Sequence, residues 1–585
     1  MRLGCIWRGG LLIRYVLVLF AVQLPVVFTC SSLKAQESLH LAPGGRIEEL
    51  PQPFPEAPQP APPVIEQPTP PFAAPESGER PAPGPRFLAR EIKVSGSTVF
   101  SSEEIAKVTA PYLNLELTSE DLEALRRALT ILYINKGYIN SGAVIPDQTI
   151  VGGVVNIKIV EGKLTDIEVQ GNKWLCSRYY LSRIALDDGP PVNIYTLQQR
   201  LQLFQQGDLV QQVHAELKPG LNPGESELNM QVEERLPFAV TTGYNNYQSS
   251  TVGENRGVVT LADKSLTGHG DILSFTYAGS EGVNPEIDTW YSFPITARDT
   301  TLILHYQQND YGVVQAPFNS LNVLSDSNMY GITLRQPLYR SLSQEFAIAL
   351  SGERLHDETS LLGEPFSFSP GATGGISTVT ALRFSQEWLY RTQTEVLAAR
   401  SRFSFGIDAL GATINPGSLP DSRFFSWLGQ FQWARILGES GIQAVVRTDM
   451  QLSDDPLLPL EQIPVGGRYS VRGYPENTFV RDNAVISSME VRFPLVRDKS
   501  WADYLQLAPF VDFGQAWNTK EPTPPGDVLA SVGIGLRWAL TALKKPFPMK
   551  PEFEIYWGYA LDNIATSGNS LQANGVHLQF TVTAF

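Results

Sequence analysis

The spacing of apolar and polar residues divides the chain into a helix-containing region and a long region that contains only strands. In residues 87–162, one alternating segment precedes two segments with helical spacing, and two more alternating segments follow. The first helix is expected to begin at Ser101 or Ser102, because hydroxyl side chains cap the free N–H groups at a helix start. The second is expected to begin at Thr118 or Ser119. The pattern predicts the order strand, helix, helix, strand, strand.

The same order of elements returns in residues 163–236. Two strands follow two helices again, so the chain repeats itself with a period of about 75 residues. The segment "IKIVEGKLTDIEVQGN" joins the copies without a spacer. The sequence therefore predicts two α+β domains (β-α-α-β-β) joined rigidly end to end.

From residue 237 to the end, helical spacing disappears and alternating segments recur with turn residues between them. In "FFSWLGQFQWA" most aromatic residues share one face, and the serine and glutamines share the other. The segment "FEIYWGY" alternates in the same way. A soluble β-sandwich also alternates, and it is the alternative interpretation. Aromatic outward faces, charged opposite faces and segments of about ten residues favour a transmembrane β-barrel.

The length of this region sets the expected size of the barrel. At roughly 20–25 residues for each strand and its loop, residues 237–585 suit about 14–18 strands, and even numbers are the bacterial rule. We therefore predict a mainly β protein, with a C-terminal 16-stranded transmembrane β-barrel preceded by the two α+β domains.

The N-terminal residues carry targeting and linker signals. Three arginines precede the apolar run "YVLVLFAVQLPVVFT", which predicts an export signal over residues 1–35 with cleavage after Ala35. Lipidation at Cys30 is the alternative, although a threonine precedes it where a smaller residue is usual. Residues 36–86 are dominated by proline and predict an extended linker. A proline-rich ligand for a partner is the alternative interpretation of that segment.

Composition narrows the class of function. The chain has 585 residues, a net charge of −15, 18% charged residues and 10% aromatic residues. An acidic balance argues against a nucleic-acid partner, which requires a basic face. Outside the predicted signal, Cys176 is the one cysteine, so it predicts neither an internal disulfide nor a metal cluster. We interpret it as a small buried residue.

The stretch "GGRYSVRGYPE", residues 466–476, has neither strand alternation nor a helix period. It lacks the P-loop pattern G-x-x-x-x-G-K-[ST], and no helical pattern follows it to bind a phosphate. A hydrolase is also disfavoured, because the chain has no G-x-S-x-G or H-E-x-x-H motif. We predict no catalytic residue, no cofactor and no metal ion, and hence no enzyme.

The phase of a later strand suggests a role for this stretch. In "LQLAPFVDFG", the face that contains Val511 and Phe513 is apolar and is expected to meet lipid, so Asp512 is expected to face the lumen. A carboxylate in a narrow lumen requires a cation, since an unpaired buried charge is costly. Arg472 is the candidate, because its planar fork can bind a carboxylate with two hydrogen bonds. The alternative is an exposed loop cation and an ordinary lumen charge.

From about Phe87 to Phe585, the sequence resembles the TpsB transporters of two-partner secretion. The motifs that carry the resemblance are "SVRGYPE", the following "ISSMEVRFPL", and "FVDFG". The two repeats look like POTRA domains, the periplasmic modules of this superfamily. The resemblance implies that a long loop, about residues 453–483, folds into the barrel and docks on its wall. The implied docking motif consists of Arg472, Gly473, Tyr474, Phe510, Asp512 and Gly514.

The resemblance also implies a location and partners. The barrel would lie in the lipid of the cell outer membrane, with the POTRA domains in the periplasm. The client would be an unfolded secreted protein, haemolysin- or adhesin-like and β-helical, and the barrel assembly machinery would insert the transporter. Two alternatives are an assembly factor that inserts other barrels, and a simple porin or receptor. Two repeats favour a TpsB transporter over an assembly factor, and a porin would not need them.

The sequence departs from the family pattern at both ends. Family members often begin with a helix that plugs the barrel, whereas here "RIEEL" is the one weak helical candidate in a proline-rich region. Family barrels also end on an aromatic residue in phase with apolar residues behind it. Phe585 is a candidate barrel C-terminal signal, but Val576, Leu578, Phe580 and Val582 alternate one step out of phase with it. A local β-bulge is expected to restore the phase.

Overall fold

The computed structural model describes residues 65–66, 86–187, 191–541, 548–562, 564 and 570–585. The predicted signal, the candidate plug helix and most of the proline-rich segment lie outside these residues. One compact unit ends at Arg235, and a second begins at Leu236. Among the described residues, no helix is long and apolar enough to cross a membrane.

The first repeat has the predicted order of elements, with one addition. Its strands and helices are β3 (Glu91–Ser95), α2 (Ser102–Thr109), α3 (Ser119–Asn135), β5 (Gly142–Val144) and β6 (Val154–Val160). The addition is a pair of short strands, β2 (Phe87–Ala89) and β4 (Leu115–Leu117), with a 3₁₀ turn η1 (Ala110–Tyr112) before β4. Ser101 and Thr118 cap the two helices through reciprocal side-chain and backbone hydrogen bonds with Glu104 and Asp121.

The second repeat has the same topology. It contains β7 (Lys163–Gln170), α4 (Ser177–Ile184), a 3₁₀ turn η2 (Ala185–Asp187), α5 (Ile194–Gln206), β8 (Val210–Pro219) and β9 (Glu225–Glu234). In each repeat the strand before the first helix pairs in parallel with the last strand: β3 with β6, and β7 with β9. The strand between them in sequence pairs antiparallel with the last. The internal repeat is therefore confirmed.

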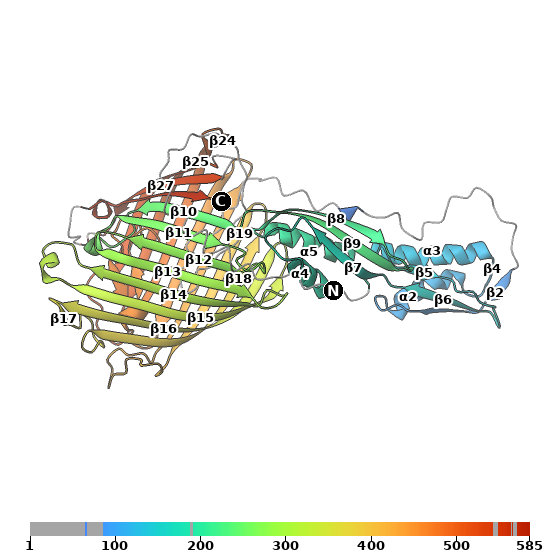
Figure 1. Ribbon diagram of the computed structural model, residues 1–585, viewed down its shortest axis with the longest axis horizontal. Coiled ribbons are helices and arrows are strands. Elements are labelled where there is room, and N and C mark those ends of the chain that lie inside the picture. The colour runs from blue at the N-terminus through green and yellow to red at the C-terminus, as the bar shows by residue number, and fades with distance from the viewer. Residues whose placement is uncertain (1–64, 67–85, 188–190, 542–547, 563, 565–569) are drawn as a thin grey trace. The chain divides into compact units, whose positions relative to one another are not determined.

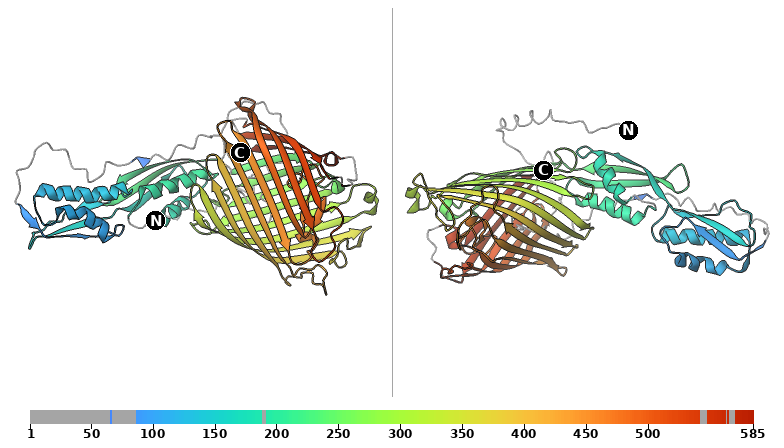
Figure 2. Two further views of the ribbon diagram at one scale, coloured as in Figure 1. Left: turned by 180° about the vertical axis from the view of Figure 1, so that it is seen from behind. Right: turned by 90° about the horizontal axis from the view of Figure 1, so that it is seen from below.

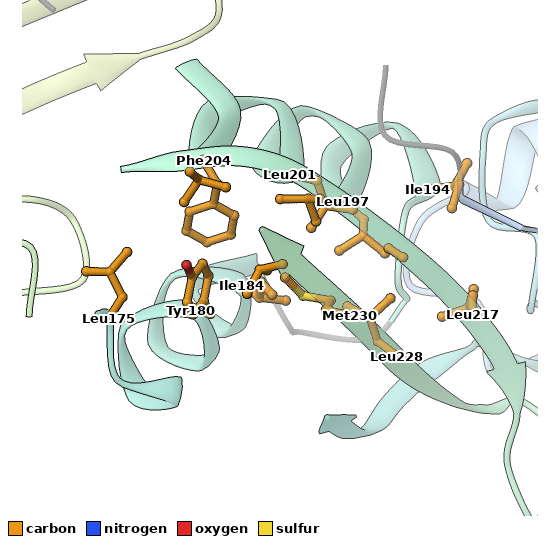
Figure 3. Packing of buried hydrophobic residues seen from close by; sticks show 14 residues of the cluster. Leu175, Tyr180, Ile184, Ile194, Leu197, Leu201, Phe204, Leu217, Leu228 and Met230 are labelled. Carbon is orange, nitrogen blue, oxygen red and sulfur yellow. The ribbon is translucent and has the colours of Figure 1, made fainter. Parts of the chain in front are cut away.

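Each repeat buries an apolar core between its helices and its sheet. In the second repeat, side chains of α4 and α5 point toward those of β8 and β9 (Figure 3). Leu201, Leu228 and Tyr180 are fully buried there. The regular spacing of Leu197, Leu201 and Phe204 on α5 places them on one helix face, which explains why this face packs on the sheet.

A partly buried carboxylate holds the corresponding loop in both repeats. Glu161, after β6, accepts hydrogen bonds from the N–H group of Thr98 (2.7 Å) and the hydroxyl of Tyr133 (2.9 Å). Glu234, at the end of β9, accepts from two N–H groups of the loop before α4 (2.6 and 2.7 Å) and from Tyr180 (2.7 Å). The two repeats therefore share equivalent hydrogen bonds as well as the same fold.

Direct hydrogen bonds join the two repeats. The N–H of Ile194 donates to the carbonyl of Gly137 (2.9 Å), and the side-chain amide of Asn140 donates to the hydroxyl of Ser226 (2.9 Å). Backbone contacts of this kind leave little freedom between the repeats, which supports the prediction of a rigid end-to-end arrangement.

Two residues of the proline-rich segment also pair with the second repeat. Strand β1 (Ile65–Glu66) runs parallel to β8, opposite Ala215 and Glu216. The sheet order is therefore β1-β8-β9-β7, and β1 occupies the edge that β8 would otherwise expose. An extended backbone at this place agrees with the predicted linker.

The second unit is a closed antiparallel β-barrel of tilted strands (Figure 1, Figure 2). Within the described residues, sixteen strands form its wall and β28 pairs with β10 to close it. A two-residue strand, β17 (Glu364–Pro365), extends the β16 hairpin. The wall strands are β10 (Phe238–Asn245), β11 (Arg256–Asp263), β12 (Ile272–Gly279), β13 (Val283–Pro294), β14 (Thr301–Gly312), β15 (Leu324–Arg340), β16 (Gln344–Leu361), β18 (Ile376–Arg391), β19 (Glu395–Gly406), β20 (Phe425–Leu437), β21 (Ile442–Ser453), β24 (Asn483–Lys499), β25 (Ala502–Trp517), β26 (Val528–Ala539), β27 (Met549–Ala560) and β28 (Val576–Ala584). Short 3₁₀ turns lie in the loops: η3 (Ser250–Val252), η4 (Phe318–Leu321) and η6 (Gln572–Asn574).

The alternation of side chains along the wall follows the predicted phase. Val511 and Phe513 on β25 are 56% and 41% exposed, whereas Asp512 between them is 1% exposed. The outward face of β27 likewise presents Trp557 and Tyr559. An apolar outer face and a polar inner face are what a strand needs when lipid lies outside and water inside.

The expected bulge near the C-terminus is wrong. Strand β28 pairs with β27 and with β10 in an unbroken register as far as Ala584. Phe580 keeps its outward position, at 42% exposure. Phe585 follows the last strand residue, and its N–H donates to the carbonyl of Pro548 (3.0 Å). Because it lies beyond the ladder, Phe585 does not need a bulge to leave the phase of the strand.

Candidate functional site: a loop docked inside the barrel

The connection between β21 and β24, residues 454–482, packs against the inner wall of the barrel. It contains a 3₁₀ turn, η5 (Pro459–Glu461), and two short strands, β22 (Ile463–Val465) and β23 (Phe479–Arg481), that pair with each other. Apolar side chains of the loop pack on the inner faces of β24, β25 and β26. This cluster consists of Ile463, Val465, Val471, Tyr474, Phe479, Ala484, Ile486, Ala516 and Leu529.

Arg472 stands at the tip of this loop and contacts carboxylates of two neighbouring strands. Its Nε and Nη2 atoms donate to the two oxygens of Asp512 on β25, each at 2.8 Å, and its backbone N–H donates to the same carboxylate (3.0 Å). Nη1 donates to Glu490 on β24, and Nη2 also donates to Ser488 (3.0 Å). Both Arg472 and Asp512 are buried. All three nitrogen atoms of the guanidinium therefore donate hydrogen bonds, as expected for a buried charge.

Two aromatic rings lie against the guanidinium. The Cζ atom of Arg472 lies 3.6 Å from the ring centroid of Phe510 and 4.8 Å from that of Tyr556 on β27. The two rings meet edge to face at 5.9 Å. Stacking on an aromatic face favours a desolvated cation, and it explains why Phe510 belongs to the motif although it does not ionise.

Glycines allow the loop backbone to approach the wall. Gly473 has φ = 95°, which favours glycine, and a Cβ built on Gly558 of β27 would lie 2.7 Å from the Gly473 Cα. A Cβ on Gly514 would lie 2.7 Å from the side chain of Val465. Tyr474 then donates from its hydroxyl to the carbonyl of Ala530 on β26 (2.9 Å). The tip and the wall are thus complementary in shape as well as in charge.

A second ion pair lies beside the tip. Arg468 donates through Nε and Nη2 to Glu554 on β27 (3.0–3.1 Å). Glu554 also accepts from the hydroxyl of Tyr247, which lies in the loop after β10 (2.9 Å). Gly473 donates its N–H to His577 on β28 (3.4 Å). The ring of Tyr469 meets that of Tyr247 edge to face, with centroids 5.6 Å apart. The loop tip therefore contacts β28 and the loop after β10, the two strands that close the barrel being β28 and β10.

The structure brings the six residues of the implied docking motif together and adds others. Sequence reasoning missed Glu490, Arg468 and Glu554. The alternation of β24 could have revealed Glu490. Met489 faces outward and Glu490 faces inward, just as Val511 faces outward and Asp512 inward on β25. Local periodicity shows no signal that would pair Arg468 with Glu554, which lies 86 residues away in the sequence.

The chemistry of this site is electrostatic and steric. It contains arginines, carboxylates, aromatic rings and glycines, which fasten one segment to another through contacts that water can replace. In the described part of the chain, no group of three or more His, Cys, Asp or Glu side chains is placed to hold a metal ion.

Comparison with known proteins then places the chain in a family. The family described as haemolysin secretion/activation protein ShlB/FhaC/HecB matches residues 224–538, more than half of the chain. The chain belongs to this family. A second match covers residues 87–162 and is described as a POTRA domain of the ShlB type. Members of the family are TpsB-type outer-membrane transporters, so the chain is a transporter of the outer membrane with its POTRA region in the periplasm.

Individual relatives agree with this assignment. The outer membrane transporter CdiB of Dickeya dadantii is 25% identical over 414 residues, which cover 69% of this chain and 72% of the relative. The solved structure of CdiB from Escherichia coli superimposes with a TM-score of 0.65 at 20% identity, over 88% of this chain and 92% of that one. BamA from Haemophilus ducreyi, lacking POTRA domains 1–3, shares the fold at a TM-score of 0.50 and 14% identity. The family match favours the transporter over the BamA-like alternative.

Proposed function

We propose that the docked loop is a movable closure of the barrel and that Arg472 and Asp512 hold it in place. The observation that carries this proposal is the nature of the attachment: the loop tip is held by buried ion pairs with several wall strands (Asp512, Glu490 and Glu554). The net free energy of such a pair is a small difference between attraction and desolvation. Release into water therefore costs far less than the separation of paired strands would.

The client is an exported protein that arrives unfolded, binds the POTRA region and leaves through the barrel. The domain boundaries that go with this function are a signal over 1–35, a linker over 36–86, POTRA domains over 87–162 and 163–236, and the barrel from 237 onward. Transport proceeds without covalent chemistry by this chain. Folding of a haemolysin- or adhesin-like β-helical client outside the cell biases its movement outward. A client that cannot fold outside yet leaves at the normal rate would contradict this last step.

The edge of β8 is the binding site for the extended client within the second repeat. Strand addition at a sheet edge gives affinity through main-chain hydrogen bonds with little demand on sequence. The pairing of β1 along two residues of β8 supports this, because it shows an extended segment seated at that edge. Hydrogen exchange of the intact protein tests it: addition of client slows exchange along β8. Slowing confined to β7, the other edge of the sheet, contradicts the assignment.

A gene deletion tests the function as a whole. Proteins of the culture medium and of the outer membrane are compared by mass spectrometry with and without this chain. We expect one very long exported protein to disappear from the medium while other outer-membrane barrels remain. General loss of those barrels would instead indicate an assembly factor, and an unchanged medium contradicts secretion.

A further inference from the structure

The beginning of the docked loop makes its own attachment to the barrel, at a different place from the tip. Residues 456–461, "PLLPLE", form this loop base. Leu457 and Leu458 are buried, and they pack with Val379 and Ala381 on the inner face of β18 and with Phe424 before β20. These apolar contacts fix the loop base without any residue of the tip.

A buried ion pair ends this segment. Glu461 accepts two hydrogen bonds from the guanidinium of Arg383 on β18, at 2.6 Å from Nη2 and 3.0 Å from Nη1. The side chains of Arg383 and Glu461 are 4% and 6% exposed. Arg383 also donates to Glu353 on β16 and to Ser404 on β19, each at 2.7 Å. A fork-to-fork contact of this kind is both strong and specific in orientation.

The two attachments use different parts of the wall. The tip contacts β24 to β28, whereas the base contacts β18 through Glu461 and β21 through the carbonyl of Glu461, which accepts from Gln451 (2.9 Å). In the order of the barrel, β19, β20, β21 and β24 separate β18 from β25. The ion pairs of the tip and the base share no residue. Loss of one therefore leaves the other intact.

Asp482 joins the two ends of the loop. One of its oxygens accepts from the N–H of Leu457 (3.0 Å) and from the side chain of Gln462 (2.9 Å), and the other accepts from the N–H of Thr519 after β25 (2.8 Å). Asp482 is buried. It clamps the residues before β22 and after β23, so the β22–β23 hairpin between them can leave as a unit.

We propose that Arg383 and Glu461 form a second latch, independent of Arg472, and that the loop is released in two steps. Breaking the tip contacts frees residues 463–481, while residues 456–461 stay on β18. Arg383 is thus a positioning residue for the loop base. The importance of this arrangement for transport rests on the proposed function, but the mechanics of the loop can be tested without a client.

Cysteine reporters in the intact transporter separate the two attachments. Ser470→Cys reports on the tip and Pro456→Cys on the base, because both positions are buried when the loop is docked. The reporters are placed in a chain with Cys176→Ser, and cells are treated with a membrane-impermeant maleimide. We expect Arg472→Ala to raise labelling of the tip reporter at least tenfold and that of the base reporter less than twofold. Glu461→Gln is expected to give the opposite pattern.

A surface ion pair of the same loop provides the matched control. Lys520 contacts Asp455 at 2.6 Å, with side chains 55% and 41% exposed, and exposed pairs contribute little. We expect Lys520→Gln to leave both reporters at background. Migration of the unheated protein on a denaturing gel shows whether each barrel is folded. If Glu461→Gln does not fold, Glu461→Asp keeps the charge and is expected to expose the base reporter to a smaller degree.

Two results would overturn the second latch. Equal labelling of both reporters in Arg472→Ala means that the loop moves as one body. A base reporter that stays at background in every folded Glu461 variant means that the ion pair holds nothing. Secretion measured in the same strains answers the separate question of transport, so failure of the proposed function and failure of the latch give different results.

Discussion

The POTRA-type repeats and the barrel interior bury opposite kinds of side chain. The core of the second repeat is made of residues such as Leu201, Leu228 and Met230, whereas the inner wall of the barrel buries Arg383, Glu490 and Asp512. In the repeats, water lies outside and the apolar residues turn inward. In the barrel, lipid lies outside, and the charges turn inward toward the docked loop. The same alternation rule thus builds two cores of different chemistry.

This difference bears on which part can open. Separating apolar surfaces in water costs roughly 25 cal/mol for each Å² exposed, and nothing compensates for it. Separating a buried ion pair lets both charges recover their hydration, which offsets most of the lost attraction. The repeats are therefore suited to remain folded during transport. The loop is held by both kinds of contact, so its ion pairs lower the cost of release while its apolar cluster on β24, β25 and β26 favours its return.

The largest effect is expected where a buried charge loses its partner. Arg472→Ala removes the cation that pairs with the buried carboxylate of Asp512, whereas Glu490 keeps its ion pair with Arg492. Loss of one partner of a buried pair costs about 3–5 kcal/mol. We expect the loop to undock, so that an added protease cuts it in otherwise intact barrels. Arg423→Gln is the control, because it removes an ion pair whose arginine is 55% exposed. A loop that stays protected in Arg472→Ala would show that the apolar contacts alone hold it.

The next effect concerns the apolar core of the repeats. Leu201→Ala creates a cavity at a fully buried position and is expected to destabilise the second repeat by about 2–5 kcal/mol. Brief proteolysis of the intact protein across a urea series measures this change. Leu221→Ala is the matched control, since Leu221 is 96% exposed. If the two variants unfold at the same urea concentration, the repeats do not depend on an apolar core.

The sequence predicts local features in both regions but not the contacts between distant segments. Helix caps at Ser101 and Thr118 and the inward phase of Asp512 could be predicted, because each follows from a few neighbouring residues. The strands β2 and β4 were missed, because three residues are too few to show alternation. The pairing of Glu461 with Arg383 could not be found either. It depends on the path of the loop across a closed barrel, which no local period encodes.

A smaller effect is expected at a partly buried, hydrogen-bonded carboxylate in the first repeat. Burial opposes the ionisation of Glu161, but hydrogen bonds from Thr98, Tyr133 and Val99 outweigh it and lower the pKa of its carboxyl. A lowered pKa stabilises the fold above the unfolded value of about 4.3, and that stability is lost as the pH falls through the folded value. Glu161→Gln is expected to cost about 1–3 kcal/mol at neutral pH.

The pH dependence separates this charge effect from simple loss of packing. Proteolysis in urea at several values between pH 3 and 7 should show the native protein weakening toward the acid end, while Glu161→Gln changes less. Glu91→Gln serves as the control, because the carboxylate of Glu91 contacts Lys93 where both side chains are exposed. Parallel curves for the native protein and Glu161→Gln would mean that the hydrogen bonds act without the charge.

The smallest effect is expected at a solvent-exposed helix cap, and two adjacent serines allow it to be isolated. Ser101 accepts from the N–H of Glu104 at the start of α2, whereas Ser102 is the first helical residue. Loss of an N-cap typically costs about 1 kcal/mol, so Ser101→Ala should lower the urea midpoint of the first repeat slightly. Ser102→Ala should stay within about 0.5 kcal/mol of the native protein, as surface changes usually do. If both variants shift the urea midpoint equally, the effect comes from the helix propensity of serine and alanine and not from the capping hydrogen bond. The repeats would then owe their stability to buried apolar contacts and to the hydrogen-bonded carboxylates, which would sharpen their contrast with the barrel.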